Sequence, residues 1–431
     1  MNSSLNRRRF LQASAALPAT AALATRTNAR GARILGANDS VTLGFIGVGG
    51  MGTGLLNVFK GFPDVRVAAL ADVHEPHLLK AKELAGGKPD VTGDFRKILD
   101  RKDIDAVVVA TPDHWHAIPS ILACQAGKDV YCEKPLAFTI GEGRRVADAA
   151  AKHKRVTQMG NLIHAGESYH RMAEIAQSGV LGEIRKVRVW MSGRLPKDGI
   201  GKPADTPVPA GTDYNFWLGP APERPFNANR FTFNWRYYWD YGGGQLSDFV
   251  CHLVDPVHWG MKATAPETIV AHGERVQQDN AETPDELEVV YHYPEGFDLV
   301  WSAQPHNSQG FFGRGNGIAF YGTNGTMHGH YNDYVVLPEG KEPIKEPEPF
   351  LPRSKGHHRE WIDAIKSRAE CSCNFGYGHT LTAVAHLGNM ALKTGKKLHW
   401  DAKAEKVTNA PEANNYLFRP EYRAPWKLPE V

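Results

Sequence analysis

Residues 41–52 read VTLGFIGVGGMG. The apolar, β-branched first half of this stretch predicts a buried strand, and the glycine-rich second half predicts a tight turn that opens a helix. Gly47, Gly49 and Gly52 have the spacing G-x-G-x-x-G. In that pattern the first glycine permits the turn, the second lets a pyrophosphate approach the backbone, and the third lets the helix pack on the strand. The stretch therefore predicts a dinucleotide site.

A second predicted strand, residues 66–71, ends at Asp72, about 20 residues beyond the last glycine. An acidic residue at this position binds ribose hydroxyls, and its charge repels a 2′-phosphate. Asp72 therefore favours NAD as the cofactor, with NADP left open. The cofactor-binding residues predicted for this first unit are Gly47, Gly49, Gly50, Met51, Gly52 and Asp72.

The chain has 431 residues, which is long enough for two domains. A hydrophobic content of 42% and a charged content of 23% are typical of globular proteins. The net charge is only +3, so the composition gives no indication of a nucleic-acid partner. The five cysteines are scattered, and their spacing matches neither a disulfide framework nor a C-x-x-C metal motif.

Residues 7–12 read RRRFLQ and precede a mildly apolar run, residues 13–23, with an A-x-A-like site at residues 22–24. This order predicts a signal peptide that resembles a twin-arginine export signal, with a basic disordered tail as the alternative. The apolar run is too short to span a bilayer. Residues 1–38 would comprise this signal peptide and a linker, and after removal of the signal we expect a periplasmic or otherwise exported protein without a stable membrane span. Its partner in export would be the twin-arginine machinery.

The export signal bears on the cofactor. The twin-arginine pathway is understood to carry folded proteins, so a nucleotide can be bound before export. The periplasm is not expected to supply free nicotinamide cofactor. We therefore expect NAD to be tightly bound and to be regenerated within each catalytic cycle.

Strands and helices alternate through residues 39–160, which predicts a Rossmann domain with a doubly wound parallel sheet. In residues 161–431 the pattern changes to period-2 strands and separate helices, which predicts an α+β domain with an open, largely antiparallel sheet. A loop rich in glycine, proline and aromatic residues, 192–244, is too long to be inert. An open apolar sheet face needs covering, so we expect a homo-oligomer, either a dimer or a tetramer.

Two short motifs follow neighbouring strands of the predicted parallel sheet, at the edge where ligands bind in open α/β sheets. One is TPDHWH, residues 111–116, and the other is EKP, residues 133–135. We expect Lys134 to contact a substrate hydroxyl, and we expect its surroundings to lower the pKa of the Lys134 ammonium group. The alternative is an ordinary surface lysine. Capping and packing are the alternative roles of the histidines. The residues assigned here to the cofactor are Thr111, Pro112, His114, Trp115, His116, Glu133 and Lys134.

Asp248 and His252 lie four residues apart in a predicted helix that begins near Ser247, so they share one helical face. A carboxylate beside an imidazole orients the ring and raises its basicity, as proton removal from an alcohol requires. A helix N-terminal aspartate with a packed histidine is the alternative. Asp255 and His258 lie nearby, but no metal-ligand spacing is present, so we predict no metal.

These motifs, in this order and spacing, resemble the Gfo/Idh/MocA family of oxidoreductases. The resemblance covers most of residues 41–401 and rests on the glycine turn, Asp72, Thr111-Pro112, Glu133-Lys134-Pro135 and the D-x-x-x-H of residues 248–252. It implies a Rossmann domain followed by an α/β domain whose open sheet mediates oligomers.

The resemblance also implies roles for single residues. Lys134 would contact both the nicotinamide and the substrate hydroxyl, and His252 would be the acid and base. Asn161 matches an active-site asparagine, which we place among the cofactor contacts. An arginine that often follows this asparagine in the family is absent, because Ile163 and His164 stand there. We take His164 as a substrate contact.

Aromatic residues of the long loop are further candidates for substrate binding. Aromatic faces stack on the C–H surfaces of sugars, and the loop resembles those of exported family members that act on glycosides. Tyr238 and Trp239 are therefore predicted sugar platforms. The alternative is that they fill a small core within the loop.

Three functions follow from the sequence. The first is an exported NAD(P)-dependent oxidoreductase that acts on the hydroxyls of a sugar, glycoside or polyol, with Lys134, Asp248 and His252 as catalytic residues. The second is an NAD-requiring glycosidase or epimerase with transient oxidation, akin to family 109 glycoside hydrolases, although residues 244–260 differ from the motif of that family. The third is a catalytically silent cofactor-binding or sugar-binding subunit.

Overall fold

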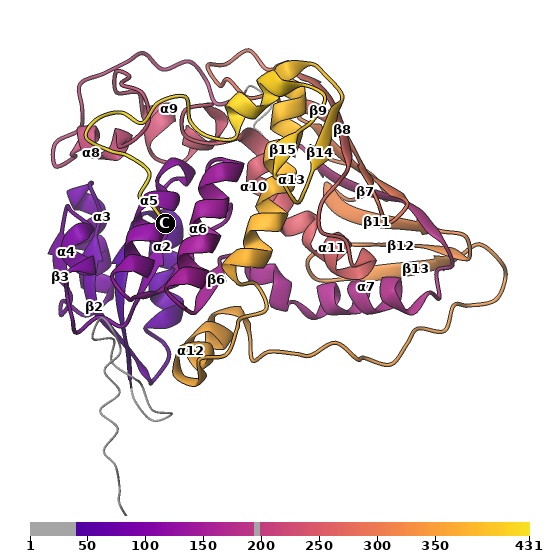
Figure 1. Ribbon diagram of the computed structural model, residues 1–431, viewed down its shortest axis with the longest axis horizontal. Coiled ribbons are helices and arrows are strands. Elements are labelled where there is room, and N and C mark those ends of the chain that lie inside the picture. The colour runs from indigo at the N-terminus through magenta and orange to yellow at the C-terminus, as the bar shows by residue number, and fades with distance from the viewer. Residues whose placement is uncertain (1–39, 194–198) are drawn as a thin grey trace, which may run out of the picture.

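The computed structural model describes residues 40–193 and 199–431 (Figure 1). The signal peptide and linker predicted for residues 1–38 lie outside the described residues. Two sheets follow one another along the described chain, and none of its helices is long and apolar enough to cross a membrane. The predicted fold class, a Rossmann sheet followed by an α+β unit with a largely antiparallel sheet, is confirmed.

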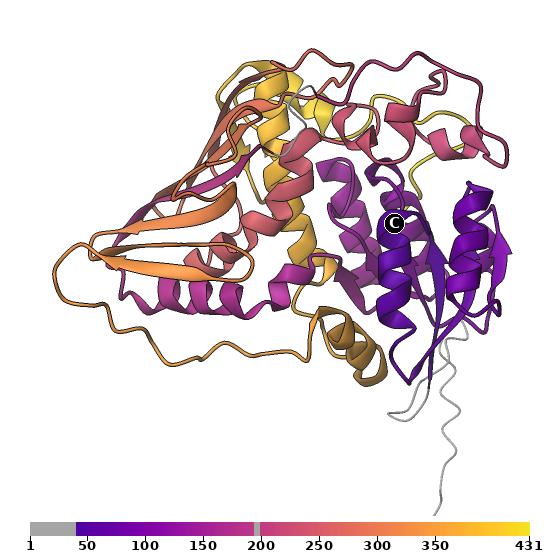
Figure 2. The same cartoon turned by 180° about the vertical axis from the view of Figure 1, so that it is seen from behind.

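The first sheet has six parallel strands in the order β3-β2-β1-β4-β5-β6. Helices lie in front of it and behind it (Figures 1 and 2). Every residue of β1 and β4 is buried, which explains their continuous apolar sequences. Strand β3 lacks an apolar run because it is an exposed edge strand, so the sequence does not predict it. The strands are β1 (Val41–Ile46), β2 (Val65–Ala71), β3 (Asp90–Thr92), β4 (Ala106–Val109), β5 (Asp129–Cys132) and β6 (Thr157–Met159), and the helices are α2 (Gly50–Phe59), α3 (Glu75–Leu84), α4 (Arg96–Leu99), α5 (Ala117–Gln125) and α6 (Ile140–Lys152).

The second sheet has nine strands in the order β13-β12-β11-β7-β10-β9-β8-β14-β15. The pair β7–β10 is parallel and its other pairs are antiparallel. Along β9 buried and exposed residues alternate, as in a sheet with one covered face. The strands are β7 (Ile184–Ser192), β8 (Thr268–Glu274), β9 (Glu286–Tyr293), β10 (Phe297–Gln304), β11 (Asn316–Gly322), β12 (Gly325–Gly329), β13 (Tyr334–Pro338), β14 (Leu398–Asp401) and β15 (Lys406–Val407).

Helices cover one face of the second sheet, and the long α13 runs between the two halves of the molecule (Figure 1). On the opposite face Val270 and Val290 remain exposed. Coverage of that face by a second copy of the chain stays a prediction. The helices of this half are α7 (Glu167–Ser178), α10 (Gly244–Leu253), α11 (Asp255–Met261) and α13 (Phe375–Thr394).

Helix α12 (His357–Ser367) belongs by sequence to the second half but packs on the first. Its Trp361 ring lies 5.5 Å from the ring of Phe59 and 5.6 Å from that of Tyr131, centroid to centroid. Arg359 of the same helix forms an ion pair with Asp64. The chain therefore returns to the Rossmann half after completing most of the second sheet, so the two halves share a core.

Residues 199–243, which we call the strap, lie over the edge of the first sheet where its strands end (Figures 1 and 2). The strap contains the short helices α8 (Tyr214–Leu218) and α9 (Ala228–Phe231) and its own aromatic core. Backbone hydrogen bonds of 2.9 Å from Asp213 N to Val73 O and of 2.8 Å from Glu75 N to Gly211 O attach it to the turn after β2. The strap, which the sequence predicts as part of a long loop, is thus a folded segment that covers this edge of the first sheet.

The C-terminal tail contacts α6 through a buried ion pair and the strap through a backbone hydrogen bond. Arg419 Nε donates to Glu142 Oε1 at 2.7 Å, both side chains are almost fully buried, and Arg419 Nη2 donates to the carbonyl of His114 at 2.7 Å. Further along the tail, Arg423 N donates to Pro220 O of the strap. The tail therefore links the strap to the Rossmann half.

We predict that Arg419→Met lowers the free energy of unfolding by about 3–5 kcal/mol, because it leaves the Glu142 carboxylate buried without its cation. Arg185→Met, which breaks an exposed pair with Glu183, is the control and should cost less than about 1 kcal/mol. Chemical denaturation of both variants measures the difference. Equal losses in the two variants would contradict this role of the tail.

Candidate active site

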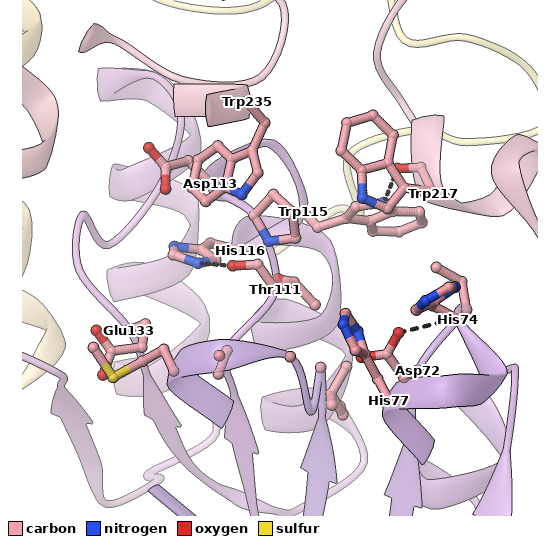
Figure 3. Close-up of a pocket in the computed structure, with 18 of the residues that line it drawn as sticks. Asp72, His74, His77, Thr111, Asp113, Trp115, His116, Glu133, Trp217 and Trp235 are labelled. Carbon is pink, nitrogen blue, oxygen red and sulfur yellow. Dashed lines mark hydrogen bonds and ion pairs between the residues drawn. The ribbon is translucent and has the colours of Figure 1, made fainter. Parts of the chain in front are cut away.

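A cavity of about 360 Å³ lies at the carboxyl ends of β1, β2, β4 and β5, beneath the strap (Figure 3). In Figure 3 Asp72, His74 and His77 stand on one side of it and Asp113 and Glu133 on the other. Most of the predicted cofactor residues therefore line one space. Those that do are Gly47, Gly49, Gly50, Met51, Asp72, Thr111, Pro112, Trp115, His116, Glu133 and Lys134.

The glycine turn has the geometry that a dinucleotide site requires. Gly47 has a φ of +85°, and a Cβ there would lie 2.7 Å from the carbonyl oxygen of Ala110. A Cβ on Gly52 would lie 2.1 Å from the carbonyl oxygen of Gly47, so α2 packs directly on the turn. At Gly49 a Cβ would meet only the His77 ring, at 3.4 Å, and at Gly50 nothing within 4 Å. The backbone is therefore open toward the cavity where a pyrophosphate would approach.

Asp72 and Thr111 present polar groups to the same cavity. Asp72 accepts hydrogen bonds of 2.9 Å from the backbone N–H groups of Val48 and His74, which fix its carboxylate at the end of β2. Thr111 Oγ1 is buried without a hydrogen-bond partner among the described residues. A buried hydroxyl of this kind is satisfied by a ligand, so these residues fit a dinucleotide.

A buried ion pair joins the first sheet to α10. Lys134 Nζ donates to Asp248 Oδ1 at 2.5 Å and to the Asp248 carbonyl at 2.9 Å, with both side chains about a tenth exposed. Arg236 Nε of the strap lies 3.4 Å from Asp248 Oδ2. Asp248 is thus held between two cations from different parts of the chain.

The predicted lowered pKa of Lys134 is wrong. Burial alone would lower it, but attraction by Asp248 and the hydrogen bond to it hold the pKa of Lys134 above its ordinary value. Burial likewise opposes ionisation of Asp248, but Lys134 and Arg236 hold its pKa far below the ordinary value. Both members of the pair are therefore charged at neutral pH.

Two further carboxyl groups line the cavity. Burial raises the pKa of Asp113 to about 7 against the opposing charges of Arg236 and Lys134. Burial also raises the pKa of Glu133 to about 7 against Lys134. Each can gain or lose a proton near neutral pH. The sequence includes Asp113 in the quoted motif but gives no signal that it is buried.

His252 lies one turn after Asp248 on α10, but its ring is oriented by another residue. His252 Nδ1 makes a 2.7 Å hydrogen bond to Asn161 Oδ1. The carboxylate of Asp248, to which the sequence assigned this role, instead pairs with Lys134 and Arg236. Asn161 is fully buried and does not line the cavity. In this structure it therefore contacts His252 and is not among the residues that surround the predicted cofactor space.

Other predicted site residues are absent from the lining of the cavity. His114 Nε2 bonds to the Trp217 carbonyl at 2.9 Å, and burial lowers the pKa of His114 to about 3, so the ring is neutral. His164 is buried against Asp255. Tyr238 is 1% exposed within the core of the strap, which favours the packing alternative. Trp239 is half-buried, with Lys393 Nζ 4.0 Å from the centroid of its ring.

The strap supplies a further part of the cavity wall, which sequence reasoning missed. Its seven lining residues cover the cavity from above, and Arg236 stacks on two of their rings. Across residues 40–193 and 199–431, no group of three His, Cys, Asp or Glu side chains is gathered as a metal site. The strap residues of the wall are Phe216, Trp217, Phe231, Thr232, Phe233, Trp235 and Arg236.

Comparison with known proteins agrees with this fold. Residues 41–161 match the Gfo/Idh/MocA model described as the oxidoreductase family, NAD-binding Rossmann fold, and residues 168–428 match the one described as the C-terminal alpha/beta domain. An alpha-N-acetylgalactosaminidase of Shewanella oneidensis and a glycosyl hydrolase family 109 protein of Shewanella putrefaciens are each 31% identical over 206 residues, which is 42% of this chain and 44% of the relative. The match thus spans less than half the length of these curated relatives.

Solved structures share the fold over most of this chain. The WlbA dehydrogenase from Bordetella pertussis, in complex with NADH and UDP-GlcNAcA, has a TM-score of 0.66 at 17% identity and covers 84% of this chain and 99% of that chain. A levoglucosan dehydrogenase in complex with NADH and L-sorbose has a TM-score of 0.61 at 19% identity, with the same coverage. At these identities the likeness shows the fold alone.

We predict that Gly49→Ala separates cofactor binding from folding. The added methyl group meets only the His77 ring, so the free energy of unfolding should change by less than about 1 kcal/mol. The same methyl group would overpack a bound pyrophosphate at about 1–3 kcal/mol, which weakens NAD binding about tenfold or more. Calorimetric titration of cofactor-free protein measures the affinity. Gly54→Ala, in open space on α2, is the control, and unchanged affinity in Gly49→Ala would contradict the assignment.

Proposed function

This chain belongs to the Gfo/Idh/MocA family of oxidoreductases, and from that premise we propose that it is an exported NAD-dependent enzyme acting on hydroxyl groups of a sugar, glycoside or polyol. The observation that carries the proposal is the charged Lys134–Asp248 pair between the NAD-binding edge and α10, with His252 one helical turn away. Export rests on the twin-arginine-like segment of residues 1–38.

The chain's own residues hold and move the proton of the substrate hydroxyl. Bound NAD would supply the hydride chemistry, as acceptor or donor at the substrate carbon. Lys134 uses two of its three donors on Asp248, so its third donor is directed to the substrate oxygen. Asp248 keeps Lys134 charged, and that charge stabilises negative charge on the oxygen. His252 takes the hydroxyl proton.

The glycine turn, Asp72 and Thr111 would hold the cofactor, and the strap would keep it in place. The strap forms part of the wall of the cavity and is attached at both the β2 turn and the C-terminal tail. Release of a dinucleotide would require these contacts to open. This closure supports the proposal that NAD is tightly bound and favours it over exchange with free cofactor.

A redox-neutral glycosidase is the second candidate, and a specific observation favours it. Transient oxidation of one hydroxyl acidifies the neighbouring C–H, elimination then releases the aglycone, and addition of water with reduction restores the sugar. Elimination needs a base for the C–H proton and an acid for the leaving oxygen. Asp113 and Glu133, each with a pKa of about 7, line the same cavity and can serve in these extra proton transfers. The glycosidase names of two curated relatives point the same way.

The two candidates differ in their products. A panel of sugars, glycosides and polyols is added to the full-length protein, with absorbance of reduced nicotinamide and release of aglycone followed together. Reduced nicotinamide that stays on the protein without aglycone release indicates net oxidation of the sugar, as by a dehydrogenase, whereas aglycone release without it indicates the glycosidase. Absence of both signals across the panel would contradict the proposed substrate class.

We predict that His252→Gln lowers turnover of the active substrate by about 10²–10⁴-fold, because the glutamine amide cannot accept the hydroxyl proton. NAD binding should be unchanged, since His252 does not line the cavity. His399→Gln, which replaces an exposed histidine, is the control for the substitution itself. Full activity in the His252 variant would contradict its assignment as the base.

A further inference from the structure

A buried polar chain begins at His252, and its members are absent from the lining of the cavity. His252 Nδ1 bonds to Asn161 Oδ1 at 2.7 Å. Asn161 Nδ2 in turn lies 2.9 Å from the carbonyl oxygen of Cys251 and 2.9 Å from Asp255 Oδ2. Asn161 and Asp255 are both fully buried, so each of these polar atoms depends on its partners in the chain.

The surroundings of Asn161 permit only one orientation of its amide. A backbone carbonyl has no proton to donate, so the group that faces the Cys251 carbonyl must be the amide nitrogen. The same nitrogen reaches the Asp255 carboxylate, which accepts its second proton. The amide oxygen is therefore the atom turned toward His252, and an amide oxygen can only accept.

We propose that Asn161 fixes the tautomer of His252, with Asp255 as the residue that fixes Asn161. Because Asn161 Oδ1 can only accept, His252 Nδ1 must carry a proton. In the neutral ring, Nε2 is then the nitrogen without a proton, and it is the one that can act as the base. The opposite tautomer would set two acceptor atoms against each other at 2.7 Å. Asn161 and Asp255 are positioning residues in this account, not contacts of the cofactor.

Asp255 is itself held by side chains from two other elements. His164 Nδ1 lies 3.0 Å from both carboxylate oxygens, and the Tyr377 hydroxyl of α13 donates to Oδ1. Burial alone would lower the pKa of His164, but the Asp255 carboxylate holds it above the ordinary value. The His164 ring also stacks on Trp259, with centroids 4.7 Å apart. His164 thus supports Asp255 and is absent from the lining of the cavity, while the substrate contact assigned to it from sequence stays a prediction.

The test reads the tautomer directly and does not require a substrate. The full-length protein is labelled with ¹⁵N-histidine, its spectrum is recorded at a pH where the His252 ring is neutral, and the His252→Gln variant assigns the signal. We expect a directly bonded proton on Nδ1 and none on Nε2. A proton on Nε2 in the neutral ring would overturn the inference.

Variants of Asn161 test the positioning role. In Asn161→Leu we expect the His252 signals to become those of a mixture of tautomers, while the affinity for NAD is unchanged. The control is Asn389→Leu, which removes a buried amide that bonds to Gly243 and Ser247 at the start of the same helix, and it should leave the His252 tautomer as in the native protein. An unaltered tautomer in Asn161→Leu, or a loss of NAD affinity confined to that variant, would overturn the proposal.

The inference concerns the residue that the proposed function makes the base, so it deepens that function and rests on it. The experiments can disprove the proposed function and the tautomer assignment independently of each other. A native protein that is inactive on every carbohydrate but carries Nδ1–H overturns the proposed function and leaves the tautomer assignment standing. If Asn161→Leu does not fold, the spectrum of the native protein still decides the tautomer.

Discussion

The ion pair between Lys134 and Asp248 is the contact on which the arrangement of the site depends. Removal of two charges from water costs several kcal/mol for each ion, so both must be paired where they are buried. Lys134 lies just beyond β5 and Asp248 lies in the first turns of α10, 114 residues later. Their pairing sets α10 against the edge of the first sheet, and His252 follows one helical turn beyond that contact. The position of the proposed base is thus tied to the position of the proposed oxyanion contact.

The strap imposes a second constraint, on the cofactor rather than on the substrate. It supplies part of the wall of the cavity and contains its own aromatic core, so it is a folded unit rather than a flexible loop. Hydrogen bonds fasten it to the β2 turn, and the C-terminal tail contacts it from the other side. An enzyme with this cover is suited to keep one nicotinamide through many cycles. An exported protein would need that property where free cofactor is absent.

Local sequence patterns predicted much of the first half. The strand, glycine turn, helix and Asp72 were readable because each depends on neighbours within a few turns of chain. The edge strand β3 lacked a hydrophobic signal. The packing of α12 on the first half was not readable either, because its Trp361 contacts Phe59 and Tyr131, which lie far away in the sequence. The same reason explains the site: the partner of Lys134 is Asp248, and the partner of His252 is Asn161, 91 residues away. Periodicity reveals which face a residue occupies but not which distant atom it meets.

The central claim is that this chain encloses NAD beneath the strap and uses it without release. The most direct measurement is on full-length protein purified without added nucleotide, which is denatured so that any released dinucleotide can be identified by mass and absorbance. The account predicts a stoichiometric amount of NAD(H) that survives purification and extensive dialysis. Protein that emerges empty, takes up NAD from solution and loses it again on dilution would contradict the claim.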